Sequence, residues 1–328
     1  MLKVEVAELM EQEGKVFEIA QKTTYNLNLT NEEKEISAIC DAWVKEVAEK
    51  GDANKEIAAF VKRTIQDEIY NAPDELLDLM FDRGAVGEFD DYDVTKTPKN
   101  TLQAHEAAKG GTVDRSWIDF SQLKPTWKNR QVETDLSYVE MRKQGFKSIA
   151  TLTNYAVEAL RNAQFYDIFN MIDSAIVGGE QLIAETGTAP TQASMDKLAL
   201  YLNDRDPNAV AVTLTKYAQA IGRMNGQAQY MSEAMKNDFN RYGLVKFFDG
   251  INVAGLSSAK KITNGNLLIP DKRIYGIAGK VGTLDQKGEI HVYEDLDNSN
   301  EKLKLKIADF TYGFCITDIS KVAKMTIA

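Results

Sequence analysis

Residues 146–176 read FKSIATLTNYAVEALRNAQFYDIFNMIDSAI, which is the strongest helical pattern in the chain. Apolar side chains recur at helical spacing from Ile149 through Ala156 to Leu160, and neither glycine nor proline interrupts the run before Gly178. About thirty residues at about 1.5 Å per residue make a rod of about 45 Å. Because the run follows no heptad pattern, it predicts one long structural helix, which we call the spine, and not a coiled coil.

Two extended segments precede the spine. Residues 113–122 are rich in aromatic and β-branched side chains, and residues 132–138 alternate apolar and polar side chains with the period of a strand. Between them, residues 124–129 predict a turn with Trp127 at its tip. A two-stranded hairpin alone is only marginally stable in water, so we expect this arm to lie on another surface.

The region before the arm predicts helices. Thr30 and Glu33 occupy the two positions of a capping box, ahead of apolar residues at helical spacing. Further helices are predicted at residues 2–20, 57–69 and 74–81, the last with Pro73 at its start. Their amphipathic stripes need a covering surface, either within the chain or on a neighbouring molecule.

The region after the spine is mixed at first and then β-rich. Helices are predicted at residues 191–202, 216–224 and 232–241, and strands at 209–214, 244–248, 274–284, 289–294, 302–307, 314–316 and 322–327. Residues 285–288 predict a hairpin turn, and the lysines that alternate through residues 302–307 are typical of a protected sheet edge.

Composition and charge indicate a folded, soluble protein. The 328 residues are 44% hydrophobic and 27% charged, about two domains' worth, which excludes a disordered chain or a collagen. The net charge is −10, with 23 acidic and 12 basic side chains in residues 1–100 against 26 and 27 in residues 101–328. This asymmetry fits either two solvated surfaces or opposite-signed surfaces that meet between copies. The net negative charge also disfavours a protein that wraps nucleic acid over its whole surface.

The sequence offers no constellation for catalysis, for a cofactor or for a metal. His105 and His291 lie far apart, which excludes a His/Cys zinc site. Cys40 and Cys315 lie in apolar patterns and are interpreted as small hydrophobic residues, in a chain made in a reducing cytoplasm. No apolar run has the length of a signal peptide or a membrane span, so we expect no membrane partner.

Three partial motifs are better explained by structure. The acidic segments around Asp91 and Asp295 lack the glycine and the glutamate of a calcium loop. The glycines at 276, 279 and 282 have the wrong spacing for a phosphate loop and instead suit a bending strand. Ser194 and Lys197 match Ser-x-x-Lys, but the partner motifs of an acyl-transfer site are absent from the sequence.

The order of these parts resembles the major capsid protein of tailed bacteriophages, an α+β fold of the HK97 type. The resemblance lies in a long spine helix, an extended two-stranded arm, closing antiparallel sheets and a helical N-terminal region. It covers roughly residues 95–328. Its carriers are residues 117–138, 146–176, 208–217, 247–251 and 290–327.

The resemblance implies four structural parts and a function. Residues 1–94 would be a helical acidic N-terminal region or N-arm, 95–146 the extended loop (E-loop), 147–190 with 285–318 the peripheral domain, and 191–284 with 319–328 the axial domain. Copies would assemble as hexamers and pentamers into an icosahedral shell of the virion that encloses double-stranded DNA without sequence-specific binding. Scaffolding, portal, decoration and maturation-protease proteins are the other partners that it implies. We expect the N-terminal region to be retained.

Other functions remain open at this stage. An encapsulin-type cellular nanocompartment shares the fold. A metal-dependent hydrolase would have to use carboxylates without a recognisable motif, with Asp90, Asp91 and Asp93 as the first candidates. An adaptor would bind its partners through the N-terminal helices. The enzyme hypothesis predicts a thermal stability that depends on divalent metal. The adaptor hypothesis predicts that deletion of residues 1–90 leaves a monodisperse, folded remainder, whereas the shell hypothesis predicts very large particles or capsomers.

Overall fold

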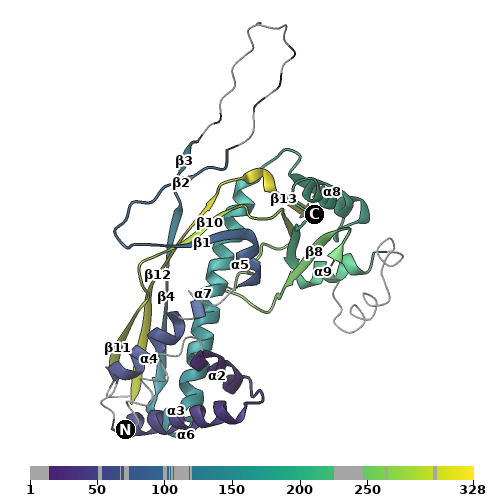
Figure 1. The fold of residues 1–328 in the computed structure, drawn as a ribbon. Helices are drawn as coiled ribbons and strands as arrows, with labels where there is room; N and C mark the ends of the chain where they lie inside the picture. Colours follow the sequence, from purple (N-terminus) through teal and green to yellow (C-terminus); the bar gives the residue numbers. More distant parts are fainter. Residues whose placement is uncertain are drawn as a thin grey trace.

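The fold is taken from a computed structural model of the chain (Figure 1). The structure describes residues 15–50, 54–66, 68–69, 74–98, 102, 104, 106, 118, 120–224, 247–262, 265–297 and 301–328. The spine is confirmed as one helix, α7 (Phe146–Ala175), of 30 residues. It runs along the molecule, with a long sheet beside it and a second, more compact sheet near its C-terminal end (Figure 1).

The long sheet has five strands built around β12 (Lys302–Ile316). Antiparallel β4 (Thr126–Ser137) pairs along one edge of β12, while β10 (Gly282–Lys287) and β11 (His291–Asp297) share the other edge end to end. Parallel β1 (Phe81–Val86) completes the sheet beside β10. The β12–β4 register shifts between Ile307 and Phe310, where Asp309 has φ 63°, so the long strand bulges between β11 and β10.

This pairing corrects the expected geometry of the arm. The predicted turn at residues 124–129 is wrong, because Trp127 lies inside β4 opposite Gly313 of β12. A Cβ at Gly313 would stand 2.7 Å from the Trp127 ring, so the glycine makes room for the indole. The predicted alternation of residues 132–138 is confirmed, with Leu136 and Tyr138 buried. Strand β4 therefore pairs with β12 of its own chain and is not part of an outstretched hairpin.

The second sheet has six strands in the order β5-β13-β9-β6-β8-β7. Their bounds are β5 (Leu182–Glu185), β13 (Val322–Ile327), β9 (Arg273–Ile277), β6 (Val210–Leu214), β8 (Ile251–Leu256) and β7 (Phe247–Phe248). Helices α8 (Gln192–Asn203) and α9 (Thr215–Gly222) lie close to their predicted positions and pack on this sheet. Residues 232–241 and 244–246 lie outside the described residues.

Three strand predictions need correction. Residues 274–284 are two strands, β9 and β10, in different sheets, and Gly279 with φ 67° lies at the break. Residues 285–287 continue β10, so no hairpin joins β10 to β11. The lysines of residues 302–307 lie on β12, which is paired on both sides, so they mark the solvent face of the sheet and not an edge.

The N-terminal helices cover the spine within the same chain. They are α2 (Lys15–Thr24), α3 (Asn31–Lys50), α4 (Asn54–Gln66) and α5 (Glu75–Met80). The capping box is confirmed, since Glu33 N–H donates to Thr30 Oγ1 (3.3 Å) and Thr30 N–H to Glu33 Oε2 (2.7 Å). The ring of Phe60 lies 6.1 Å from that of Phe146, which joins α4 to the start of the spine. Residues 2–14 lie outside the described residues.

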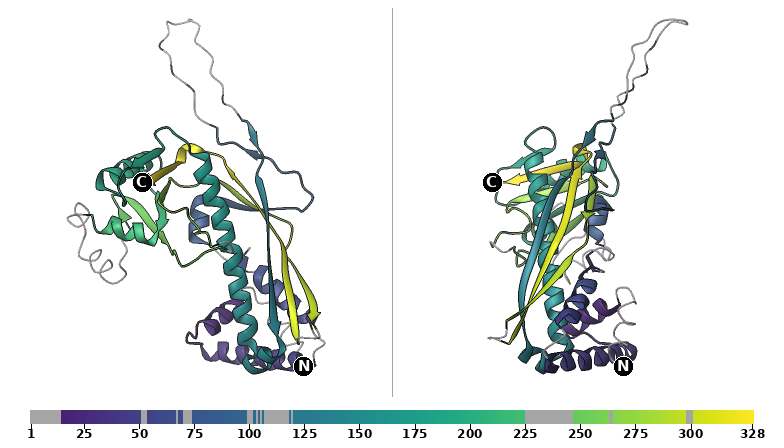
Figure 2. Two further views of the ribbon diagram at one scale, coloured as in Figure 1. Left: turned by 180° about the vertical axis from the view of Figure 1, so that it is seen from behind. Right: turned by 90° about the vertical axis from the view of Figure 1, so that its left-hand side faces the viewer.

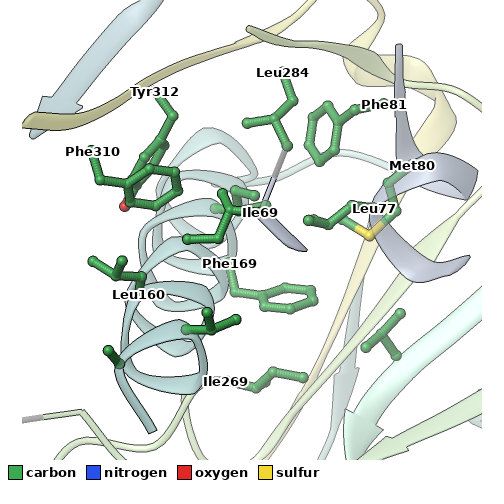
Figure 3. Close-up of a cluster of buried hydrophobic side chains, with 14 of the residues drawn as sticks. Ile69, Leu77, Met80, Phe81, Leu160, Phe169, Ile269, Leu284, Phe310 and Tyr312 are labelled. Carbon is green, nitrogen blue, oxygen red and sulfur yellow. The ribbon is translucent and has the colours of Figure 1, made fainter. Parts of the chain in front are cut away.

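One apolar core joins these parts. Figure 3 shows Leu77, Met80 and Phe81, from α5 and β1, gathered with Phe169 of the spine and Leu284 of β10. The short elements complete the described chain: α6 (Tyr138–Gln144), a 3-10 turn (Ile319–Lys321), and the two-residue strands β2 (Val94–Thr95) and β3 (Gln122–Leu123). Helix α6 and strand β1 were not expected from the sequence.

Candidate functional site

The spine is held at its N-terminal end by a side chain from α3. The Phe146 N–H donates to Asp41 Oδ1 at 3.1 Å, which satisfies one of the free N–H groups that every helix leaves at its start. Gly145 permits this approach, because it has φ 55° and a Cβ there would lie 1.7 Å from Asp41 Oδ1. A carboxylate at this end also complements the helix dipole. The N-terminal region therefore anchors the spine.

Asp167, on the spine, anchors the long sheet. Arg130 of β4 donates to both carboxylate oxygens, at 2.6 Å and 3.0 Å, and the Tyr312 hydroxyl of β12 donates at 2.6 Å. Asp167 is buried and Tyr312 fully so. The carboxylate raises the pKa of Arg130, and burial together with Asp167 raises the pKa of Tyr312. A carboxylate that accepts two strong donors from two strands fixes the sheet on the helix.

Asp173 makes the corresponding connection to the six-stranded sheet. Its Oδ1 accepts from the Tyr275 hydroxyl at 2.9 Å and from Arg273 Nε at 3.3 Å, both on β9. Lys324 of β13 places Nζ 3.3 Å from Oδ1 and donates to the Asp173 carbonyl oxygen at 2.7 Å. Burial alone would raise the pKa of Asp173, but the Tyr275 hydrogen bond and the Lys324 and Arg273 charges hold it below its ordinary value.

The two ends of the spine are therefore both complemented. The Lys324 ammonium lies at the C-terminal end, where the helix dipole favours a cation, and Asp41 lies at the N-terminal end, where it favours an anion. Asp167 and Asp173 are less than two helical turns apart, about 9 Å along the axis. Since each binds a different sheet, these two carboxylates set the orientation of one sheet relative to the other.

A contrasting region lies where β2 and β3 pair, which we call the arm root (residues 94–98 and 120–123). Val94 pairs with Leu123, Lys96 N–H donates to the Ser121 carbonyl at 2.9 Å, and the ladder extends no further among the described residues. The root projects beyond the end of the long sheet (Figure 2). Most of residues 99–119, which include the predicted strand at 113–122, lie outside the described residues.

Apolar side chains at and beside the arm root are open to solvent. Phe120 is 65% exposed and Phe89, in the loop before β2, is 92% exposed. Leu102 and Ile118 are also among the large exposed apolar residues. All four residues fall within residues 89–120, which makes this segment the candidate for a surface that another molecule covers.

Both cysteines and one of the two histidines lie within the described residues. Cys40 and Cys315 are both buried and free, and burial raises the pKa of Cys40 to about 12, so neither is an activated thiol. His291 lies on β11 with its ring 6.2 Å from that of Tyr293, and His105 lies outside the described residues.

The partial motifs are placed by local structure. Ser194 belongs to the N-terminal cap of α8, where its hydroxyl accepts from Thr191 N–H at 3.1 Å. Asp90 accepts from Gly87 N–H at 3.2 Å, while Asp91 and Asp93 lie on the exposed loop. Gly276 lies under Leu202 of α8, where a Cβ would come within 2.6 Å. In the described part of the chain, no three His, Cys, Asp or Glu side chains are grouped so as to hold a metal ion.

The spine attachments were missed from the sequence, although a signal was present. Asp167 directly precedes Ile168 and Asp173 directly follows Ile172 in an apolar stretch of the helix, where an unpaired carboxylate would be unfavourable. Such a position predicts a cationic or hydroxyl partner. It does not say which of the chain's 39 lysines and arginines supplies it.

Comparison with known proteins gives a structural likeness only. No protein-family model matches the chain, and no curated protein does. A chain from the capsid of the native GTA particle, computed with C5 symmetry, matches with a TM-score of 0.54 and 12% identity over 75% of this chain and 88% of that chain. The capsid of the empty GTA particle gives 0.52 and 13% over 76% and 88%.

A chain from Gordonia phage Cozz matches with a TM-score of 0.51 and 9% identity, over 76% of this chain and 84% of that chain. In the described ranges, no helix combines the length and the apolar character needed to cross a membrane. The likeness to the GTA capsids extends over about three quarters of this chain. The chain has the α+β fold of HK97 type.

Proposed function

We propose that this chain is the structural subunit of an icosahedral shell, the capsid of a tailed phage, and that it encloses double-stranded DNA. The observation that carries the proposal is the match to the GTA capsid, which covers 75% of this chain and 88% of that one. The exposed apolar side chains at the arm root support it, because a closed shell is built from subunits whose surfaces only neighbours cover.

The parts of the subunit follow from this proposal. The spine with the long sheet is the peripheral domain, and the six-stranded sheet with α8 and α9 is the axial domain, which meets its copies at the fivefold and sixfold positions. The E-loop starts at the arm root and is shorter than residues 95–146, because β4 belongs to the long sheet. Hexamers and pentamers of this subunit form the shell.

The role is structural and not catalytic. Two polar side chains of the spine, buried Asp167 and half-buried Asp173, join it to its two sheets. The shell contacts DNA through its inner surface without reading sequence, since tight phosphate binding needs clustered cations and the net charge is −10. The protein is made in the host cytoplasm and resides in the virion, where portal, scaffolding and decoration proteins are its further partners.

The N-terminal region stays on the mature subunit under this proposal. Asp41 caps the spine, and α2 lies against it through Asn154, whose amide donates to the Thr24 hydroxyl at 2.7 Å. Trp43 and Phe60 pack at 5.5 Å and cover Phe146. A protease that removed these helices would expose the apolar side of the spine, so we infer that a maturation protease, where present, leaves them in place.

Electron microscopy of the full chain, expressed alone, tests the proposal. We expect closed shells, or rings of five and six subunits, in negative stain. A stable monomer across a concentration series would reject it. An encapsulin-type shell would form closed particles as well, so particles purified from the native source decide between the two: nuclease-protected double-stranded DNA supports the capsid, and an enclosed enzyme supports the nanocompartment.

A further inference from the structure

Asp285 is a buried carboxyl near the arm root that none of the spine attachments uses. It lies on β10, is only 3% exposed, and has a glycine on each side across the sheet, Gly84 of β1 and Gly313 of β12. A Cβ at Gly84 would lie 2.4 Å from Asp285 Oδ1, so the carboxyl leans into the space that this glycine leaves. The sheet is therefore built around this side chain.

The carboxyl lacks the partners that a buried charge needs. Its Oδ2 is buried without a hydrogen-bond partner, and the polar groups beside the carboxyl are neutral hydroxyls, those of Tyr92 and of Thr283, two residues earlier on the same face. Within the described ranges, no lysine, arginine or histidine forms an ion pair with Asp285. Burial raises the pKa of Asp285, and the Thr283 and Tyr92 hydroxyls offset the increase only in part.

The loop of residues 87–98, whose last five residues are one strand of the arm root, follows β1 and meets this carboxyl through Tyr92. Tyr92 faces Asp285 from this loop, and burial together with Asp285 raises the pKa of Tyr92. The loop begins with a closed turn, in which Asp90 N–H donates to the Gly87 carbonyl at 3.1 Å. Lys287 Nζ donates to the Asp90 carbonyl at 3.3 Å and holds the turn on the sheet.

The other titratable groups around Asp285 do not neutralise it. Cys315 of β12 lies beside it, and burial and Asp285 both raise the pKa of that thiol. Lys287, on the same strand, is directed to the Trp127 ring at 5.3 Å and to the loop. Asp82, on the neighbouring strand β1, is paired with Lys280. An ionised Asp285 would therefore remain buried beside groups that offer it no cation.

We propose that residues 87–98 form a pH-dependent cover over Asp285, closed while the carboxyl is protonated and opened when it ionises, so that rising pH loosens the arm root. A carboxyl with a raised pKa binds its proton more tightly in the closed state than in the open one. Closing is therefore favoured below the ordinary pKa near 3.8, and that advantage is lost as pH rises through the higher pKa of the closed state. This property belongs to the single subunit and does not depend on shell formation.

Hydrogen exchange of the full chain between pH 4 and pH 8 tests the proposal. The protection factors of residues 87–95, which already remove the pH dependence of intrinsic exchange, should fall by about tenfold per pH unit within the window and then level off. Peptides from α7 report global unfolding and should not follow this trend. The isosteric variant Asp285→Asn should give flat protection, and Asp82→Asn, an exposed neighbour, should keep the wild-type slope.

Protection of residues 87–95 that stays constant with pH in the wild type would overturn the proposal, as would the same slope in Asp285→Asn or a parallel loss in α7. Should Asp285→Asn not fold, Tyr92→Phe provides the second test. The Tyr92 hydroxyl lowers the pKa of Asp285, so its removal should move the window to higher pH. An unmoved window would contradict the cover.

Discussion

The spine and the arm root differ in how much of their apolar surface the chain itself covers. Phe146, Ile168 and Phe169 of the spine are 0–1% exposed, whereas Phe120 of the arm root is 65% exposed. The spine has partners from α3, from the long sheet and from the six-stranded sheet, while the arm root has two paired residues on each strand. One region is complete in a single copy, and the other is consistent with a surface that is completed by a second copy.

The largest effect on folding is expected at Asp167. Asp167→Ala should lower the free energy of unfolding by about 3 kcal/mol, because it leaves the buried Tyr312 hydroxyl and the Arg130 guanidinium without their acceptor. The Arg130 side chain is 37% exposed and regains water, which keeps the loss at the lower end of the range for broken buried pairs. Urea denaturation measures it. Tyr312→Phe, which keeps the ion pair, should cost about 1 kcal/mol, and equal losses for the two variants would contradict this account.

A smaller effect is expected at Asp173, where the carboxylate is 29% exposed. Asp173→Asn should lower the free energy of unfolding by about 1 kcal/mol at neutral pH. Because the pKa of Asp173 is lowered in the folded protein, its contribution is present above the ordinary value of 3.8 and is lost as pH falls through the lower pKa of the fold. The gap between wild type and variant should therefore begin to close as pH falls below about 3.8 in a denaturation series, and should vanish below the lower pKa of the fold. A gap that persists at pH 2 would refute the ion-pair explanation.

A loss of stability of similar size is expected when Asp41, which caps the N-terminal end of the spine, is replaced. Asp41→Ala should lower the free energy of unfolding by about 1 kcal/mol, the usual loss when a helix N-terminus loses its acceptor. Lys45, which pairs with Asp41 at 2.6 Å and is 45% exposed, provides the matched control. Lys45→Ala should change stability by less than about 0.5 kcal/mol. If both variants lose the same amount, the surface pair matters and the cap does not.

The smallest effect on folding, and the largest on association, is expected at the arm root. Phe120→Ser should leave the thermal midpoint within about 1 °C of the wild type, since the side chain is 65% exposed, but should raise the concentration needed for assembly. Val177→Ser, at an 87% exposed position beyond the spine, is the control and should assemble like the wild type. Loss of stability in Phe120→Ser would mean that the arm root is already packed within one copy.

Local patterns in the sequence predicted the helices well, and the pairing of strands poorly. The spine, the Thr30–Glu33 capping box and α8 follow from contacts between residues three or four apart. Trp127 was placed in a turn because the preceding Lys124-Pro125 resembles one, whereas its position is set by Gly313, far away in the chain. Such long-range pairing leaves little trace in a local pattern.

The same limit applies to the candidate site. Asp167 and Asp173 were recognisable as polar residues within an apolar helix, but Arg130, Tyr312 and Lys324 come from strands whose register the sequence does not specify. Asp285 was assigned to a turn, and only the glycines across the sheet reveal that it is buried. The order of the parts was more informative than any single motif, because a fold of this kind is defined by that order.

Sedimentation velocity of the full wild-type chain over a concentration series tests whether the subunits assemble into a shell. We expect a species of one subunit at the lowest concentrations, replaced above a threshold by rings or shells many times its mass, with the threshold raised by Phe120→Ser and not by Val177→Ser. A single 36.6 kDa species at every concentration would contradict it.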